Sequence, residues 1–180
     1  QVSHTSYNII DINRNLISEK VSYGMRKPLR NIVPPIFKED NQDLWPEYNP
    51  VEARILLEKE GFCNGNKLKF PLTYRSNVPS DKLISLIIQE DIKNNLSDCI
   101  SIDIVGVEST TMYENLSKGV YPAAIFDWTG LYSDPEAYLK PLLSCSEIVD
   151  NYCEEGESVL SGSFWASKQI ENLFKESDSM

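Results

Sequence analysis

The sequence contains a single histidine, His4, and this scarcity removes the most common catalytic arrangements. Ser–His and Cys–His pairs both need an imidazole beside the nucleophile, and a lone histidine near the terminus is a poor candidate for that role. The glycines are isolated, so no glycine-rich phosphate loop is present. The cysteines do not follow a zinc-ligand spacing. We therefore predict no enzymatic activity, no catalytic residue, no metal site and no cofactor.

Long apolar runs are also absent, and acidic residues outnumber basic ones. No stretch approaches the roughly 20 apolar residues of a membrane span, and the first residues lack the features of a secretory signal. The 27 acidic and 17 basic residues give a formal net charge of -10, which argues against nucleic acid as a partner. A chain of 180 residues can bury its own core, and we expect residues 1–180 to form a single domain.

The four cysteines leave two disulfides as open alternatives to free thiols. Cys145 and Cys153 flank a short polar loop that a disulfide could close. Cys63 and Cys99 each precede a predicted strand, and they could be joined if those strands are neighbours. Four unpaired thiols in a reducing compartment are the alternative. An even cysteine count in an exported protein favours pairing, so both pairs are disulfide candidates.

Apolar periodicity and helix-capping residues predict alternating strands and helices. Helices are expected over residues 8–22, 49–61, 80–92, 109–118, 136–143 and 167–175, and strands over 67–74, 99–107 and 123–126. Pro71 favours an edge strand or a bulge, and Ser80 is the expected cap of its helix. Residues 144–163 are expected to form a polar loop. The order of elements predicts an α/β fold with a mixed, mainly parallel sheet flanked by helices.

The stretch from Tyr121 to Leu139 carries the clearest functional signal. It begins with an apolar strand over 123–126, passes Trp128 and a turn at Gly130, and reaches a helix start at Asp134-Pro135. In an open α/β sheet, a strand that ends in an exposed aromatic and turns into a helix is a common place for a ligand. The alternative is that its aromatic side chains belong to the core or its rim.

Four segments, in this order along the chain, resemble a known protein family: residues 13–35, 48–62, 67–76 and 107–139. They are similar to the second lobe of the extracytoplasmic solute-binding proteins of peptide and nickel ABC importers, the dipeptide- and oligopeptide-binding type (family 5). The resemblance implies one lobe of a type II periplasmic-binding-protein fold. It also implies that the lobe is excised from a larger two-lobe protein.

By this resemblance, the protein is the substrate-binding component of an ABC importer. It would bind a peptide or peptide-like small solute between two lobes and deliver it to a membrane permease. The implied location is the periplasm or another extracytoplasmic space, for a monomeric protein that could carry a membrane anchor in its full-length form. An alternative of another class is a standalone α/β protein-interaction or regulatory domain, whose Trp128 turn meets a protein partner.

The resemblance also assigns ligand-binding residues. Trp128 and Tyr132 would be walls of the ligand cavity, and Leu131 would lie between them on the same loop. Ser76 and Thr110, at strand-to-helix turns on the same sheet edge, would be polar contacts.

One of these positions departs from the family pattern. Peptide-binding members commonly carry an aspartate three residues after the tryptophan, where it pairs with the α-ammonium of the peptide, and this sequence has Leu131 there. Burying an ammonium without its carboxylate is costly. The hypothesis is that no α-ammonium is held at this position, with Asp127 as an alternative acid.

Overall fold

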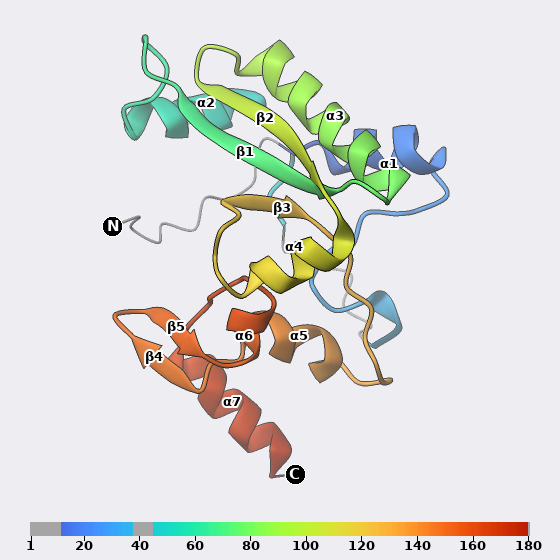
Figure 1. The fold of residues 1–180 in the computed structure, drawn as a ribbon, viewed down its shortest axis with the longest axis vertical. Helices are drawn as coiled ribbons and strands as arrows, with labels where there is room; N and C mark the ends of the chain where they lie inside the picture. Colours follow the sequence, from blue (N-terminus) through green and yellow to red (C-terminus); the bar gives the residue numbers. More distant parts are fainter. Residues whose placement is uncertain (1–11, 38–44, 180) are drawn as a thin grey trace.

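The computed structural model describes residues 12–37 and 45–179 (Figure 1). The helices are α1 (Arg14–Ser22), the short 3-10 helix η1 (Pro35–Phe37), α2 (Pro50–Lys59), α3 (Pro79–Asn95), α4 (Ser109–Leu116), α5 (Glu136–Leu143), α6 (Glu157–Leu160) and α7 (Lys168–Asp178). The strands are β1 (Leu68–Arg75), β2 (Ile100–Val107), β3 (Ala123–Ile125), β4 (Glu147–Val149) and β5 (Tyr152–Glu155). The predicted alternation of strands and helices between β1 and α5 is confirmed.

The main sheet has three parallel strands in the order β2-β1-β3. β1 and β2 pair along their whole length, from Leu68 opposite Ile100 to Arg75 opposite Val107. β3 is short, and it pairs only with the last part of β1. A separate antiparallel hairpin, β4-β5, makes the strand content mixed, and the predicted α/β class is confirmed.

The hydrophobic core lies between this sheet and helices α2 and α3. Its most deeply buried members are Cys99, at 0% exposure, and Cys63 and Leu96, each at 1%. The whole cluster consists of Ala53, Leu57, Cys63, Leu72, Ile92, Leu96, Cys99, Ile100 and Ile102. A disulfide joins Cys63, just after α2, to Cys99, just before β2, and it lies inside this core. α1 packs against α3 (Figure 1).

Pro71 lies in the central strand of the sheet, so the edge position expected for its strand is wrong. The pairing of β1 with β3 begins only at Leu72, and no β3 residue lies opposite Pro71. At this residue β1 has a neighbour on the β2 side alone, where Pro71 lies opposite Asp103. β1 is therefore locally an edge at this point, and a proline, which lacks an N–H, is tolerated.

Asn49 caps the start of α2, within the helix predicted over residues 49–61. The Asn49 side-chain oxygen accepts a hydrogen bond from the Glu52 N–H at 3.1 Å, and Pro50 occupies the first helical turn. The Asn49 amide also donates to the Glu52 carboxylate at 3.3 Å. The reciprocal bonds satisfy a backbone donor that the helix itself leaves unpaired.

Replacing Asn49 with alanine is expected to lower the free energy of unfolding by about 1 kcal/mol, because the Glu52 N–H loses its acceptor. Urea unfolding followed by circular dichroism measures the change. Asn94 lies exposed within α3, and N94A serves as the control that changes an asparagine without removing a cap. Equal stabilities of N49A and N94A would contradict the capping role.

Two helix starts differ from the prediction. α3 begins at Pro79 with Val78 as the cap residue, so Ser80 is not the cap. The reason is that proline suits the first helical position, where its missing N–H needs no acceptor. α1 begins at Arg14, after the cap Asn13, which accepts from the Leu16 N–H at 2.9 Å. Residues 8–11 of the predicted helix lie outside the described residues.

The region predicted as a polar loop, residues 144–163, contains the β4-β5 hairpin and α6, so that prediction is wrong. The hairpin turns at Asp150 and Asn151, which both have left-handed backbone angles with φ of 49° and 65°. Two consecutive residues of this kind fit the turn geometry of a two-residue hairpin. The Asp-Asn pair was the available signal, and the short, polar strands beside it hid the hairpin.

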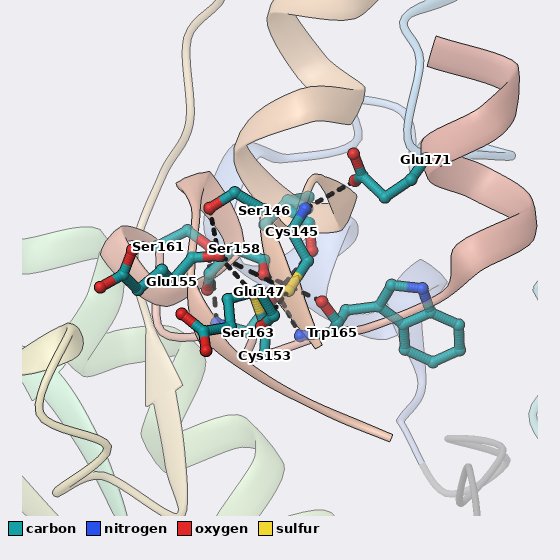
Figure 2. Close-up of a disulfide and its surroundings, with 11 residues drawn as sticks. Cys145, Ser146, Glu147, Cys153, Glu155, Ser158, Ser161, Ser163, Trp165 and Glu171 are labelled. Carbon is teal, nitrogen blue, oxygen red and sulfur yellow. Dashed lines mark hydrogen bonds between the residues drawn. A yellow bond between two sulfur atoms is a disulfide. The ribbon is translucent and has the colours of Figure 1, made fainter. Parts of the chain in front are cut away.

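A second disulfide, between Cys145 and Cys153, closes the hairpin (Figure 2). The Cys145 N–H donates to a carboxylate oxygen of Glu171 in α7 at 2.6 Å, which ties the C-terminal helix to the hairpin. Within residues 12–37 and 45–179, no helix is both long enough and apolar enough to cross a bilayer.

Candidate functional site

The candidate site is the edge of the main sheet at which all three parallel strands end. β1 is followed by Ser76, β2 by the first turn of α4, which holds Thr110, and β3 by the loop that holds Trp128. Because parallel strands place their carboxyl ends at one edge, residues far apart in the sequence come together here. Figure 1 shows β3, α4 and the end of β1 converging in this way. This edge is also where open α/β sheets bind ligands.

Hydrogen bonds join the ends of β1 and β2. The Asn77 amide donates to Glu108 at 3.2 Å, and the Ser109 hydroxyl donates to Asn77 at 2.5 Å. Glu108 caps α4 by accepting from the Thr110 N–H at 2.7 Å. The Ser76 and Thr110 side chains are exposed, and neither hydroxyl has a hydrogen-bond partner among the described residues. Both hydroxyls are thus free to contact a ligand from a fixed backbone.

The loop between β3 and α5, residues 126–135, is called the Trp128 loop below, and it is held against α5. The Trp128 indole N–H donates to the Ala137 carbonyl at 2.8 Å. At Gly130 a side chain would collide with the Tyr138 ring, since a Cβ there would lie 2.6 Å from Tyr138 Cε2. The Gly130 backbone therefore lies against the Tyr138 ring, and this contact fixes the position of the loop on α5.

Exposure excludes a core position for the aromatic residues of the loop. Trp128 is 42% exposed and Tyr132 55% exposed, so neither is a core residue. Leu131, between them, is 90% exposed. The structure brings Trp128 to the sheet edge through the end of β3, whereas Tyr132 and Leu131 lie further along the loop, toward α5. The loop presents an apolar and aromatic surface that the described residues leave partly exposed.

Arg75, the last residue of β1, organises this edge and was not foreseen from the sequence. It is 7% exposed, and its Nε donates to the buried carboxylate of Asp81 in α3 at 2.6 Å. Its Nη1 donates to the Tyr113 hydroxyl of α4 at 3.0 Å and also forms an ion pair with Asp127 at the start of the Trp128 loop. The Tyr113 hydroxyl donates to Asp127 as well, at 3.3 Å. One guanidinium thus joins β1, α3, α4 and the loop.

The contacts of this network shift the pKa values of Arg75 and Asp127 toward their charged forms. The hydrogen bond from Arg75 to Asp81 raises the pKa of the guanidinium above its ordinary value, despite the opposing effect of burial. Burial alone would raise the pKa of Asp127, but the hydrogen bond and the charge of Arg75 outweigh it and hold that pKa below its usual value. A carboxyl with a lowered pKa is an anion at neutral pH, so it is suited to binding and is a weak general base.

The described part of the chain contains no group of three or more His, Cys, Asp or Glu side chains that could hold a metal ion. A narrow crevice lies between α1 and α3, and it is lined by Ile12, Asn13, Ile17, Ile87, Ile88 and Asp91. Its walls come from helix packing and include none of the residues at the carboxyl edge of the sheet.

A parallel sheet whose carboxyl edge carries exposed aromatics, free hydroxyls and an anchored loop is an arrangement at which open α/β proteins bind ligands. The family model described as bacterial extracellular solute-binding proteins, family 5 (middle), matches residues 11–150. The chain belongs to this family, whose members are binding proteins. Its fold is that of the type II periplasmic binding proteins.

Two sequence relatives and one solved structure illustrate the match. Heme-binding protein A of Haemophilus influenzae is 28% identical over 142 residues, which cover 76% of this chain and 25% of the relative. Di/tripeptide-binding protein 3 of Pseudomonas aeruginosa is 27% identical over 177 residues, covering 93% of this chain and 32% of the relative. The murein tripeptide-binding protein MppA of Escherichia coli superposes with a TM-score of 0.76 at 18% identity, over 95% of this chain and 32% of that structure. The chain thus spans about a third or less of these proteins.

Proposed function

We propose that residues 1–180 form a single-domain lobe of the substrate-binding component of an ABC importer. The lobe contributes one wall of a site in which a peptide or peptide-like small solute is held between two lobes and passed to a membrane permease. The observation that carries this proposal is the exposed Trp128 on an anchored loop, at the sheet edge of a chain that belongs to the solute-binding family.

The roles of the site residues follow from their positions. Trp128 and Tyr132 offer large, rigid contact surfaces to the solute, which aromatic side chains provide at low entropic cost. The free hydroxyls of Ser76 and Thr110 offer hydrogen bonds to the polar groups of a peptide. Leu131 supplies apolar contact, and its side chain cannot neutralise an ammonium group.

The proposed setting is extracytoplasmic, with a monomeric protein that has no enzymatic activity and that could carry a membrane anchor. Two disulfides support this setting, because disulfides form and persist in oxidising compartments. The extracellular location named for the family supports it as well. The permease is the proposed membrane partner.

The proposal is tested on the full-length protein by native mass spectrometry, followed by denaturation to release any bound small molecule. Thermal unfolding against amino acids, peptides of two to five residues and hemin then identifies solutes that stabilise the protein. A released or stabilising small solute is the expected result. An empty protein that no compound stabilises would contradict the proposal and favour a protein-interaction domain.

Replacing Trp128 with alanine is expected to weaken binding of the identified solute about 30-fold, since buried aromatic contacts contribute about 2 kcal/mol to an interface. Isothermal titration calorimetry measures the loss. W165A is a matched control, because Trp165 is 45% exposed but follows α6, away from the strand ends. Equal affinities of W128A and the unaltered protein would exclude Trp128 from the site.

A further inference from the structure

The charges at the sheet edge do not balance. Arg75 carries one positive charge, and Asp81 and Asp127 carry two negative charges, so the three residues sum to -1. Asp81 is 4% exposed and is bound directly to the guanidinium, so it meets the positive charge inside the protein. Asp127 has a side chain that is 70% exposed. The excess negative charge therefore lies at the surface, at the base of the Trp128 loop.

The hydrogen bonds of Asp127 leave half of its carboxylate available. The Arg75 guanidinium and the Tyr113 hydroxyl both bind the same oxygen, Oδ1. Among the described residues, Oδ2 has no hydrogen-bond partner. The two bonds to Oδ1 fix the carboxylate in place, so a ligand that binds Oδ2 meets a group that is already ordered. Such preorganisation lowers the entropic cost of binding.

One aromatic side chain contacts this carboxylate, and a second is its neighbour in the sequence. Trp128 follows Asp127 directly, and Tyr113, which donates to its Oδ1, is 43% exposed. Carboxylates and aromatic rings are the two kinds of side chain that attract an organic cation. A neutral or anionic group would find no charged donor here, because Arg75 is buried and already bound to Asp81.

We infer that Asp127 binds a positively charged amine or guanidinium group of the solute, through its Oδ2, at the base of the Trp128 loop. This inference rests on the proposed function and narrows it to cationic solutes. It places the anchoring carboxylate four positions before Leu131, on the same loop. Arg75 is a positioning residue that orients the carboxylate without contacting the solute, and Tyr113 helps to orient it and adds an exposed aromatic ring beside it.

The test uses the full-length protein and two pairs of peptides that differ in one positive charge. The first pair is trialanine and N-acetyl-trialanine. The second is N-acetyl-Ala-Lys-Ala and the same peptide with norleucine in place of lysine. We expect the charged member of at least one pair to bind roughly tenfold more tightly, a ratio typical of one charge-assisted hydrogen bond, and we expect added salt to reduce the ratio.

The variant D127N removes the charge but keeps an oxygen that can accept from Arg75 and Tyr113. It is expected to bind both members of the pair with affinities that differ by no more than roughly threefold. A tenfold difference, by comparison, corresponds to about 1.4 kcal/mol. D103N is the matched control, since Asp103 is an exposed carboxylate in the middle of β2, away from the strand end. D127E, which restores a carboxylate, is expected to regain part of the preference. Thermal unfolding verifies that each variant is folded.

The outcomes separate this inference from the function on which it rests. Equal binding of charged and neutral peptides by the unaltered protein overturns the cation site and leaves the solute-binding function intact. If D127N still prefers the charged peptide, the inference is also overturned, because another residue must then bind the positive charge. If no peptide binds and the purified protein releases no small molecule, both the inference and the proposed function fail. If D127N does not fold, a wild-type preference that is insensitive to salt overturns the inference.

Discussion

Replacing Arg75 with leucine is expected to lower the free energy of unfolding by about 3–5 kcal/mol, which is the cost of leaving a buried charge without its partner. Asp81 is the charge concerned, because its side chain is 5% exposed and its ion pair with Arg75 lies in the interior. The loss also removes the bonds from β1 to Tyr113 and Asp127. Urea denaturation, followed by tryptophan fluorescence and circular dichroism, measures the change.

Two further variants show whether the unpaired Asp81 causes the loss. R75L/D81L removes both charges and is expected to recover much of the stability, since an apolar pair can replace a buried ion pair at little cost. R54L removes a partly exposed arginine that binds Asp98, whose side chain is 55% exposed, and it is expected to cost little, because solvent screens an ion pair at the surface. A loss in R75L no larger than that in R54L would show that the Arg75 network is not a structural element.

The disulfide between Cys63 and Cys99 is expected to be the more important of the two for stability. The cysteines are 36 residues apart in sequence, and loop closure of that length predicts a loss of about 3.5–4 kcal/mol for the variant C63A/C99A. Cys145 and Cys153 are separated by 8 residues, for which the same relation predicts about 2.5 kcal/mol. The burial of Cys63 and Cys99 in the core makes any rearrangement after their loss more costly.

Urea denaturation of C63A/C99A and C145A/C153A, each in non-reducing buffer, compares the two losses directly. A variant without any of the four cysteines is the control for reductant, because its stability should not change when dithiothreitol is added. A larger loss in C145A/C153A than in C63A/C99A would refute the predicted order.

Much of the fold could be predicted from short sequence patterns. Asn49-Pro50 marks the start of α2, and the alternation of Ile100, Ile102 and Ile104 marks β2, because capping and side-chain alternation are local properties. The position of β1 at the centre of the sheet could not be predicted from the sequence. Strand order depends on contacts between distant segments, and the isolated Pro71 pointed to the edge.

The candidate site could also be predicted only in part. The carboxyl ends of the strands, with Ser76, Thr110 and Trp128, follow from the order of elements and from parallel pairing. Arg75 did not follow, because its partners Asp81, Tyr113 and Asp127 lie 6, 38 and 52 residues away in the sequence. Only the folded chain reveals that one guanidinium serves all three.

The position of the Cys63–Cys99 bond has a consequence for how the chain finds its fold. Leu68 and Ile100 form the first pair of the β1–β2 ladder, and the Leu68 N–H donates to the Cys99 carbonyl at 2.9 Å. In an oxidised but unfolded chain, the beginnings of the two strands therefore remain neighbours. A slip of one residue would turn the apolar face of β2 toward water, and the covalent bond shortens the search for the alignment that avoids it.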